Sequence, residues 1–262
     1  MVFELGFIWV GLMNLVSFFI QGCTGFGSTV IAAAVTNGIL GTATGVPFGT
    51  MITIPLFVVL CFKERKNVAW LDLGKIVLFC IPGLFIGNML FYSMDQTTAK
   101  ITIGALVTFI ALMNIYKSII KPLVLKKVDT SENAEDTLVK KVLRYGCLAL
   151  GGIVHGAFNI GGPLITVYTI YAVKEKEHFR NTMTWVWLVL NIINAFNQIR
   201  NGAWTPELAG ALAVGLPFAA LGFVLGVYFL KKINKETFLR IVYLVLLFVG
   251  GNMLYTNLLA IL

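Results

Sequence analysis

Charged residues are scarce in this chain, and their scarcity argues against a soluble globular domain. Asp, Glu, Lys and Arg make up 12% of the 262 residues, whereas hydrophobic residues make up 58%. Soluble domains carry roughly 25% charged residues and at most about 50% apolar ones. The mean hydropathy of +0.87 agrees with this contrast. The composition is therefore typical of a protein that lies mostly in a lipid bilayer.

Cysteine and histidine are also few, which argues against a disulfide framework, a metal site and most enzyme chemistry. The four cysteines are scattered without a C-x-x-C motif, and the two histidines, His155 and His178, lie in different settings. We therefore expect no cofactor, no bound metal and no catalytic constellation. No G-x-x-x-x-G-K-[ST] motif occurs, so ATP coupling within the chain is not expected.

Acidic residues are fewer than basic ones, which leaves a net charge of +8. We attribute this excess to Lys and Arg that anchor cytoplasmic loops, and we expect no nucleic-acid partner. The first residues, MVFELGFIWV, have no basic residue ahead of their apolar run. A cleavable signal peptide is therefore not expected.

Long apolar runs are what the sequence does contain, and they indicate transmembrane helices. Several reach the ~20 residues that a helix needs to cross about 30 Å of hydrocarbon. The run 242–262 shows none of the alternation that barrel strands require, so we predict an all-α polytopic membrane protein. Two apolar segments, 28–40 and 163–173, are too short to span, because about eleven residues of helix cover only ~16 Å.

The chain also repeats itself, which predicts two related halves. GCTGFGSTVI (22–31) aligns with GAFNIGGPLI (156–165) at an offset of 134 residues. Each repeat would be a broken-helix hairpin followed by three transmembrane helices. The first repeat would cover 1–120, with its hairpin at 5–40 and spans at 46–62, 70–92 and 99–119. After a linker at 121–141, the second would cover 142–262, with its hairpin at 142–173 and spans at 181–199, 207–230 and 237–261.

The distribution of Lys and Arg predicts the orientation of the chain. If each hairpin enters and leaves the membrane on one side, 17 of the 20 basic residues fall on one face. A single span over 142–173 would put basic loops on opposite faces, which the positive-inside rule disfavours. We therefore expect cytoplasmic basic loops and linker, with the N- and C-termini outside. The hairpins then start on opposite sides, so the repeats are inverted, as in many secondary transporters.

Each hairpin contains a helix break, at 25–27 in the first repeat and at 159–162 in the second, and these two breaks predict where a ligand binds. A helix that ends within hydrocarbon leaves backbone groups unpaired unless protein, water or ligand meets them. After each break a short helix begins, and its N-terminus offers N–H donors and partial positive charge that suit a small oxyanion. The candidate binding residues lie at the breaks, with one more in the following span: Gln21, Thr24, Gly25, Phe26, Gly27, Ser28, Thr29, His155, Asn159, Gly161, Gly162, Pro163 and Asn194.

Several polar residues have a structural alternative. His155 is either a packed, hydrogen-bonded histidine or a proton or substrate site. Other side chains beside the breaks either bind substrate or cap helices: Gln21, Thr24 and Asn159. A polar stripe either lines the pathway or bonds neighbouring helices: Asn191, Asn194, Asn197 and Gln198. Thr50 and Thr53 are its weaker counterparts in the first repeat.

The motifs at the breaks also carry a family resemblance. GCTGFGSTVIAAAV (22–35), and GAFNIGGPLITVY (156–168) followed by FRNT, resemble the sulfite exporter TauE/SafE family of membrane permeases over essentially the whole chain. The resemblance implies transport of small sulfur oxyanions such as sulfite, sulfonates or thiosulfate, or of small carboxylates. It points to 25–29 and 161–163 as the motif positions. Family members often have a longer glycine run where this chain has Ser28 and Thr29.

Together these features predict a secondary transporter of the inner cell membrane. It would move a small sulfur-containing oxyanion by alternating access, with the anion between the N-termini of the two short helices. The expected partners are the small anionic substrate and membrane lipid. Coupling to protons through His155 or to another ion, and assembly into a homo-oligomer, are left open. The alternatives are a passive anion channel and a transporter of small carboxylates.

Overall fold

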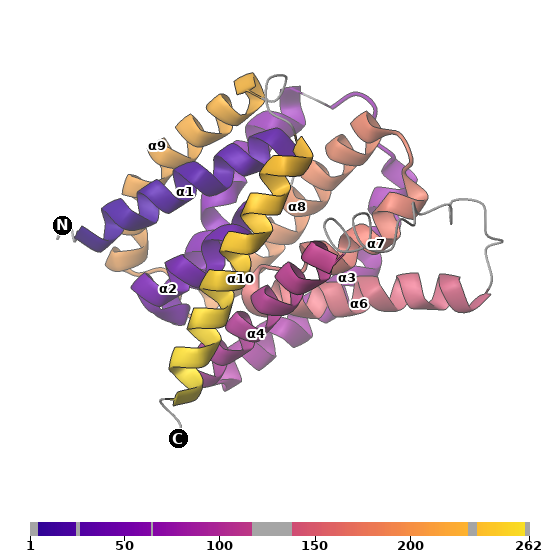
Figure 1. The fold of residues 1–262 in the computed structure, drawn as a ribbon. Helices are drawn as coiled ribbons and strands as arrows, with labels where there is room; N and C mark the ends of the chain where they lie inside the picture. The colour runs from indigo at the N-terminus through magenta and orange to yellow at the C-terminus, as the bar shows by residue number, and fades with distance from the viewer. Residues whose placement is uncertain (1–4, 25–26, 64, 117–137, 230–234, 260–262) are drawn as a thin grey trace.

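Helices make up nearly all of the chain that the structure describes. The computed structural model describes residues 5–24, 27–63, 65–116, 138–229 and 235–259. Within these residues there are nine helices and no strand (Figure 1), which confirms the all-α class. The helices are α1 (Leu5–Thr24), α2 (Ser28–Lys63), α3 (Trp70–Ser93), α4 (Gln96–Ile115), α6 (Leu138–Phe158), α7 (Gly162–Ala172), α8 (Lys176–Arg200), α9 (Pro206–Phe229) and α10 (Lys235–Leu259). Most of the predicted linker at 121–141 lies outside the described residues.

Helix α2 is two helices joined at a sharp corner. Gly41 has φ 71° and ψ 161°, a backbone conformation that is not helical and that favours glycine. A Cβ placed on Gly45 would lie 3.0 Å from the Cα of Asn37, whereas eight residues of straight helix span about 12 Å. The chain therefore turns back at Gly41. We call residues 28–40 the short arm of α2 and residues 42–63 its long arm.

The chain also doubles back at each of the two predicted breaks. A Cβ on Gly6, at the start of α1, would lie 3.1 Å from Cγ2 of Ile39, near the end of the short arm. A Cβ on Gly151 of α6 would lie 2.7 Å from Cγ1 of Ile165 in α7. The short arm therefore runs back along α1, and α7 runs back along α6.

Glycines allow helices from the two halves of the chain to pack backbone against backbone. In the α3–α6 pair, a Cβ on Gly87 would overlap the carbonyl oxygen of Ile153. In the α1–α9 pair, a Cβ on Gly222 would overlap the carbonyl oxygen of Leu15. Figure 1 shows α1 beside α9 at one edge of the bundle and α6 with α3 at the opposite edge, while α10 crosses α4 between them.

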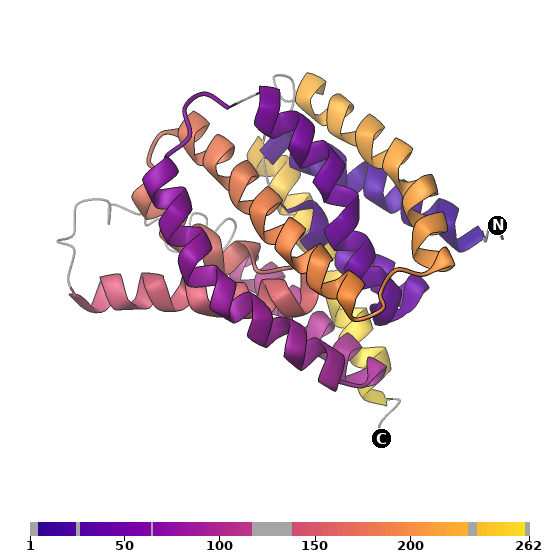
Figure 2. The same ribbon diagram turned by 180° about the vertical axis from the view of Figure 1, so that it is seen from behind.

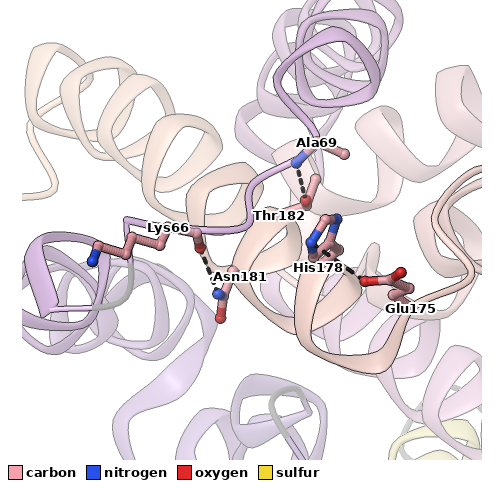
Figure 3. A network of polar contacts seen from close by, with 6 residues as sticks. All are labelled: Lys66, Ala69, Glu175, His178, Asn181 and Thr182. Carbon is pink, nitrogen blue, oxygen red and sulfur yellow. Dashed lines mark hydrogen bonds and ion pairs between the residues drawn. The ribbon is translucent and has the colours of Figure 1, made fainter.

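The long arm of α2 and helix α8 lie next to each other in the middle of the bundle (Figure 2). The connection between α2 and α3 is fastened to the first turns of α8 (Figure 3). Asn181 Nδ2 donates to the carbonyl oxygen of Lys66 at 2.9 Å, and the N–H of Ala69 donates to Thr182 Oγ1 at 2.9 Å. These bonds link the end of the long arm of α2 to the start of α8.

Four helices in the described chain are long and apolar enough to cross a membrane, judged by length and composition: Ser28–Lys63, Trp70–Ser93, Gln96–Met113 and Pro206–Gly226. Helix α8, which contains the predicted span 181–199, is not among them. Its Asn and Gln side chains lower its hydropathy, and several of them are buried; Asn191 and Asn194 are 2% and 0% exposed. Helix α8 therefore presents its polar stripe to other helices.

Candidate functional site

A buried cavity lies between α1 and the two arms of α2, and we call it the α1–α2 cavity. The volume open to the centre of a water molecule is about 20 Å³, somewhat more than the ~10–15 Å³ that one water needs. The end of α6 completes its wall. The lining residues are Asn14, Phe18, Ser28, Thr29, Ala32, Ala33, Thr36, Asn37, Gly45, Val46, Phe48, Gly49, Ile52, Phe158 and Asn159.

Asn159 brings the second break to this cavity. Its backbone has φ 59° and its N–H donates to the carbonyl oxygen of His155 at 2.8 Å, which closes α6 with a left-handed cap. The side chain is 2% exposed, and neither Nδ2 nor Oδ1 has a hydrogen-bond partner among the described residues. A buried amide without partners is costly. Facing a cavity, it is typical of a group that meets water or a ligand.

The start of the short arm supplies hydroxyl groups to the same cavity. Ser28 and Thr29 line it from the first turn of α2, and Thr36 lines it two turns later. Thr36 is 2% exposed, and its Oγ1 has no partner within the described chain. Gln21 Oε1 accepts the N–H of Ser28 at 3.1 Å, so this predicted residue satisfies one of the donors that a helix start leaves unpaired.

Part of the first break lies outside the described residues. Gly25 and Phe26 are in this part, and Thr24 is described only as the last residue of α1. Gly27 has φ 100°, which favours glycine. Among the described residues, the nearest neighbour of a Cβ on Gly27 would be the side chain of Ile31, at 3.9 Å. The described end of this break is thus loosely surrounded.

The second break is tightly packed. Gly161 precedes α7, and a Cβ there would overlap the carbonyl oxygen of Gly151. A Cβ on Gly162 would lie 3.6 Å from the ring of Trp187. Pro163 occupies the first turn of α7, where its missing N–H costs no helical hydrogen bond. None of the three predicted residues Gly161, Gly162 and Pro163 belongs to the lining of the α1–α2 cavity.

The predicted polar stripe of α8 bonds to the predicted threonines of α2 and to His155. His155 Nε2 donates to Asn191 Oδ1 at 2.8 Å, and Asn191 Nδ2 donates to Thr53 Oγ1 at 2.7 Å. Two turns further along α8, Gln198 Nε2 donates to Thr50 Oγ1 at 3.1 Å, one turn before Thr53 in α2. The Nδ1 atom of His155 has no partner among the described residues. His155 is therefore held by α8, one turn before the cavity-lining Asn159.

Asn194, another predicted site residue, joins three helices. Its Nδ2 donates to the carbonyl oxygen of His155 at 3.3 Å, and its Oδ1 accepts from Asn88 Nδ2 at 2.6 Å. Asn194 is 0% exposed and lies outside the lining of the cavity. Its observed contacts bond α8 to α6 and α3.

The family comparison decides what kind of protein has this arrangement. Residues 10–253 match the sulfite exporter TauE/SafE family. The chain belongs to that family. Membership confirms the resemblance seen in the glycine motifs and implies a multi-pass membrane transporter of the anion or sulfite type. No curated protein and no solved structure matches the chain.

Three polar residues of the cavity in this TauE/SafE chain were not predicted from the sequence: Asn14, Thr36 and Asn37. They are polar residues within apolar segments that border the first glycine motif. Polar side chains inside membrane segments are expensive and commonly functional, so this signal was present. Their meeting in one cavity depends on the first break, which folds the short arm of α2 back along α1.

The described side chains of this TauE/SafE chain form no obvious metal site. No group of three or more His, Cys, Asp and Glu residues lies together within the part of the chain that the structure describes. The polar groups of the cavity are amides and hydroxyls, which bind ions by donating and accepting hydrogen bonds.

Proposed function

We propose that this protein is a secondary transporter that binds a small sulfur-containing oxyanion, such as sulfite, a sulfonate or thiosulfate, in the α1–α2 cavity. The observation that carries the proposal is the buried amide of Asn159, which has no hydrogen-bond partner among the described residues and lines the same cavity as the start of the short arm of α2. Family membership supports the anionic class of the substrate.

The chemistry of the cavity favours an anion over a cation. Helix N-termini carry partial positive charge and present N–H groups, and here the first turn of α2 adds Ser28 and Thr29. Asn159 Nδ2 and Thr36 Oγ1 can donate further hydrogen bonds. The described lining contains no carboxylate that would repel an anion.

The anion would therefore lie between the start of one short helix and the side chain that precedes the other. This differs in detail from an anion held by both helix N-termini, because the first turn of α7 faces Trp187 instead. Gly27 would shape the approach from the first break, and Gln21 would hold Ser28 in place.

We further propose that residues 1–120 and 142–262 are inverted repeats, each with a re-entrant hairpin, and that transport occurs by alternating access. The paired approaches of α1 to α9 and of α3 to α6 support two related halves. In the same proposal, the protein lies in the inner membrane with basic loops in the cytoplasm and both termini outside. His155 is the candidate for proton coupling, through its unpartnered Nδ1.

A binding screen tests the site. Purified protein is heated with methanesulfonate, sulfite, thiosulfate, sulfate or acetate, since a ligand that binds the folded state raises Tm. The diagnostic variant is Asn159→Gly, because glycine keeps the left-handed backbone and removes only the amide. Asn67→Gly is the matched control, since Asn67 also has a positive φ of 60° but is exposed in the α2–α3 connection.

We expect a sulfur oxyanion to stabilise the wild type and Asn67→Gly but not Asn159→Gly. Equal stabilisation of all three would place the site elsewhere, and a response to acetate alone would favour the carboxylate alternative. Flux in proteoliposomes then separates the mechanisms. Accumulation of methanesulfonate, which does not titrate in this range, against its own gradient under an imposed pH gradient with the membrane voltage clamped at zero supports a transporter. Flux that only dissipates the gradient of the anion under these conditions supports a channel.

A further inference from the structure

The polar groups that line the α1–α2 cavity are all uncharged. They are the amides of Asn14, Asn37 and Asn159 and the hydroxyls of Ser28, Thr29 and Thr36. None of the described lining residues is Lys, Arg, His, Asp or Glu. Sites for doubly charged oxyanions commonly use Arg or Lys, which supply full positive charges and strong hydrogen bonds.

We propose that the α1–α2 cavity selects monoanions, such as sulfonates and hydrogen sulfite, over dianions, such as sulfate, thiosulfate and the sulfite dianion. Of the sulfur oxyanions named above, this selection removes thiosulfate. The proposal rests on the proposed function, because it names the charge state of the anion bound at the same site. It identifies the substrate class by charge, a property that membership of the family does not define.

A balance of charges carries the argument. A helix N-terminus is equivalent to roughly half a positive charge, and neutral donors compensate part of the hydration that an anion loses on entry. The second negative charge of a dianion has no cationic side chain in the lining to pair with. Burying an unpaired charge is costly, so the second charge makes entry unfavourable.

The charged groups around the cavity do not change this balance. Glu207 of α9 accepts a hydrogen bond from Thr44 Oγ1 at 3.1 Å, beside the lining residue Gly45, and a carboxylate there disfavours a second negative charge. The backbone carbonyl of His155 accepts the N–H of Asn159. The imidazole ring of His155 instead bonds to Asn191 and does not line the cavity. The described charged and titratable side chains on α6 and on the helices packed against α1 and α2 lie outside the lining, among them Lys100, Lys140, Lys141, Arg144, His155, His178, Arg180, Arg200 and Glu207.

This selection of monoanions, which we call the monoanion rule, has a consequence for sulfite, because sulfite takes up a proton near neutral pH. If only hydrogen sulfite enters the cavity, each sulfur crosses the membrane together with one proton that is carried on the substrate. A pH gradient would then drive total sulfite without any titrating residue in the protein.

Two titrations of the purified full-length protein test the rule. In the first, methanesulfonate and sulfate are compared at one pH and ionic strength; we expect methanesulfonate to bind at least about tenfold more tightly, a difference of ~1.4 kcal/mol. The methyl group is larger than the oxygen that it replaces, so a size limit alone would favour sulfate.

The second titration removes the difference in apolar surface between these two ligands. Sulfite is titrated from pH 6 to pH 8, since its two forms have the same heavy atoms. The apparent Kd equals the intrinsic Kd divided by the fraction in the binding form, so it should rise by up to about tenfold per pH unit once hydrogen sulfite is the minor form. Methanesulfonate, a monoanion throughout, should bind equally at both ends of the range.

The outcomes separate this rule from the proposed function. Sulfate that binds as tightly as methanesulfonate, or sulfite that binds independently of pH, would overturn the rule, and if Asn159→Gly still abolished binding the anion site itself would stand. Parallel pH profiles for sulfite and methanesulfonate would assign the effect to a group of the protein and would also overturn the rule. If no anion bound, or if Asn159→Gly bound as the wild type does, the proposed function and the rule would fail together.

Discussion

The two breaks in the chain have similar glycine-rich sequences but opposite surroundings. At the first break, Ser28 and Thr29 line a cavity, and a Cβ on Gly27 would meet its nearest described neighbour only at 3.9 Å. At the second, a Cβ on Gly161 would overlap the backbone of Gly151. Glycine leaves space at the first break and permits close contact at the second.

This difference separates two uses of a broken helix. A loosely surrounded helix start can receive a ligand. A tightly packed helix start instead fixes the position of the residues that come just before it. At the second break the residue so fixed is Asn159, whose side chain reaches the cavity of the first. The two breaks therefore contribute unequal parts to one candidate site. The following predictions test this division, from the largest expected effect to the smallest.

Gly161→Ala should destabilise the protein most, because the added methyl group meets backbone atoms that cannot rotate away. We expect the free energy of unfolding to fall by an amount at or above the upper end of the ~1–3 kcal/mol typical of overpacked sites. Gly162→Ala is the matched control, since its Cβ would lie at an ordinary 3.6 Å from Trp187. Thermal unfolding in detergent measures both. Similar Tm values for the two variants would contradict the tight packing of the second break.

Asn191→Ala should loosen the second break from the side of α8. It leaves His155 Nε2 unpaired and removes the bond to Thr53, and an unsatisfied buried donor costs about 1–3 kcal/mol. Asn201→Ala provides a comparison, because Asn201 is exposed just beyond the same helix and bonds only within its own turn, to Asn197. We expect a lower Tm for Asn191→Ala alone. If His155 also acts in proton coupling, this variant will in addition change the pH dependence of flux.

Thr29→Val should weaken anion binding with little change in Tm, because it removes a hydroxyl from the cavity and keeps the shape of the side chain. A hydrogen bond to a charged group contributes about 1.5–3 kcal/mol, so Kd should rise roughly 10–100-fold. Thr166→Val makes the same substitution in the first turns of α7, where Thr166 bonds to the carbonyl oxygen of Pro163 at 2.9 Å. Equal losses of affinity in both variants would mean that the two short helices share the ligand.

The smallest expected effect is that of replacing Asp95, which lies in the first half of the chain. It caps α4, whose Gln96 side chain lies against the corner at Gly41. Hydrogen bonds from the Thr98 hydroxyl at 2.6 Å and the Thr98 N–H at 2.9 Å hold the pKa of Asp95 below its usual value. A lowered pKa stabilises the fold above the unfolded pKa of about 3.9, and this contribution is lost as the pH falls through the folded pKa.

The measurement for Asp95 is a pair of melting curves across pH. Asp95→Ala should melt slightly below the wild type at pH 7, and the two Tm values should converge in acid. A gap that widened as the pH fell would contradict the assigned cap. Anion affinity at pH 7 should be the same in both proteins.

The sequence was most informative where chemistry is local. Glycine and proline at 161–163 predicted a break close to where α7 begins, and the separate segments 28–40 and 46–62 anticipated the two arms that meet at Gly41. The asparagine stripe of 181–199 indicated a polar helix face, because such side chains do not face lipid comfortably. In the structure, Asn191, Asn194 and Gln198 of that face form hydrogen bonds to neighbouring helices, which was one of the two alternatives stated for it.

The composition of the cavity could not be predicted in the same way. Asn14 and Asn37 each occupy an apolar segment, and nothing local indicates which faces of α1 and the short arm of α2 meet. The different packing of Gly27 and Gly161 was likewise hidden, since aligned glycines suggested equal roles. Their surroundings depend on contacts between distant helices. The bound anion and the inverted arrangement of the repeats are predictions for experiment.

The close glycine contacts between α1 and α9, and between α3 and α6, have a consequence for assembly of the chain during synthesis. Each contact joins a helix from before residue 117 to one from after residue 137, so neither segment can complete its own packing alone. The first hairpin must wait in the membrane until α9 is made. We therefore expect separately produced fragments to be degraded singly and to recover a stable fold when produced together, with the break in the chain lying between α4 and α6.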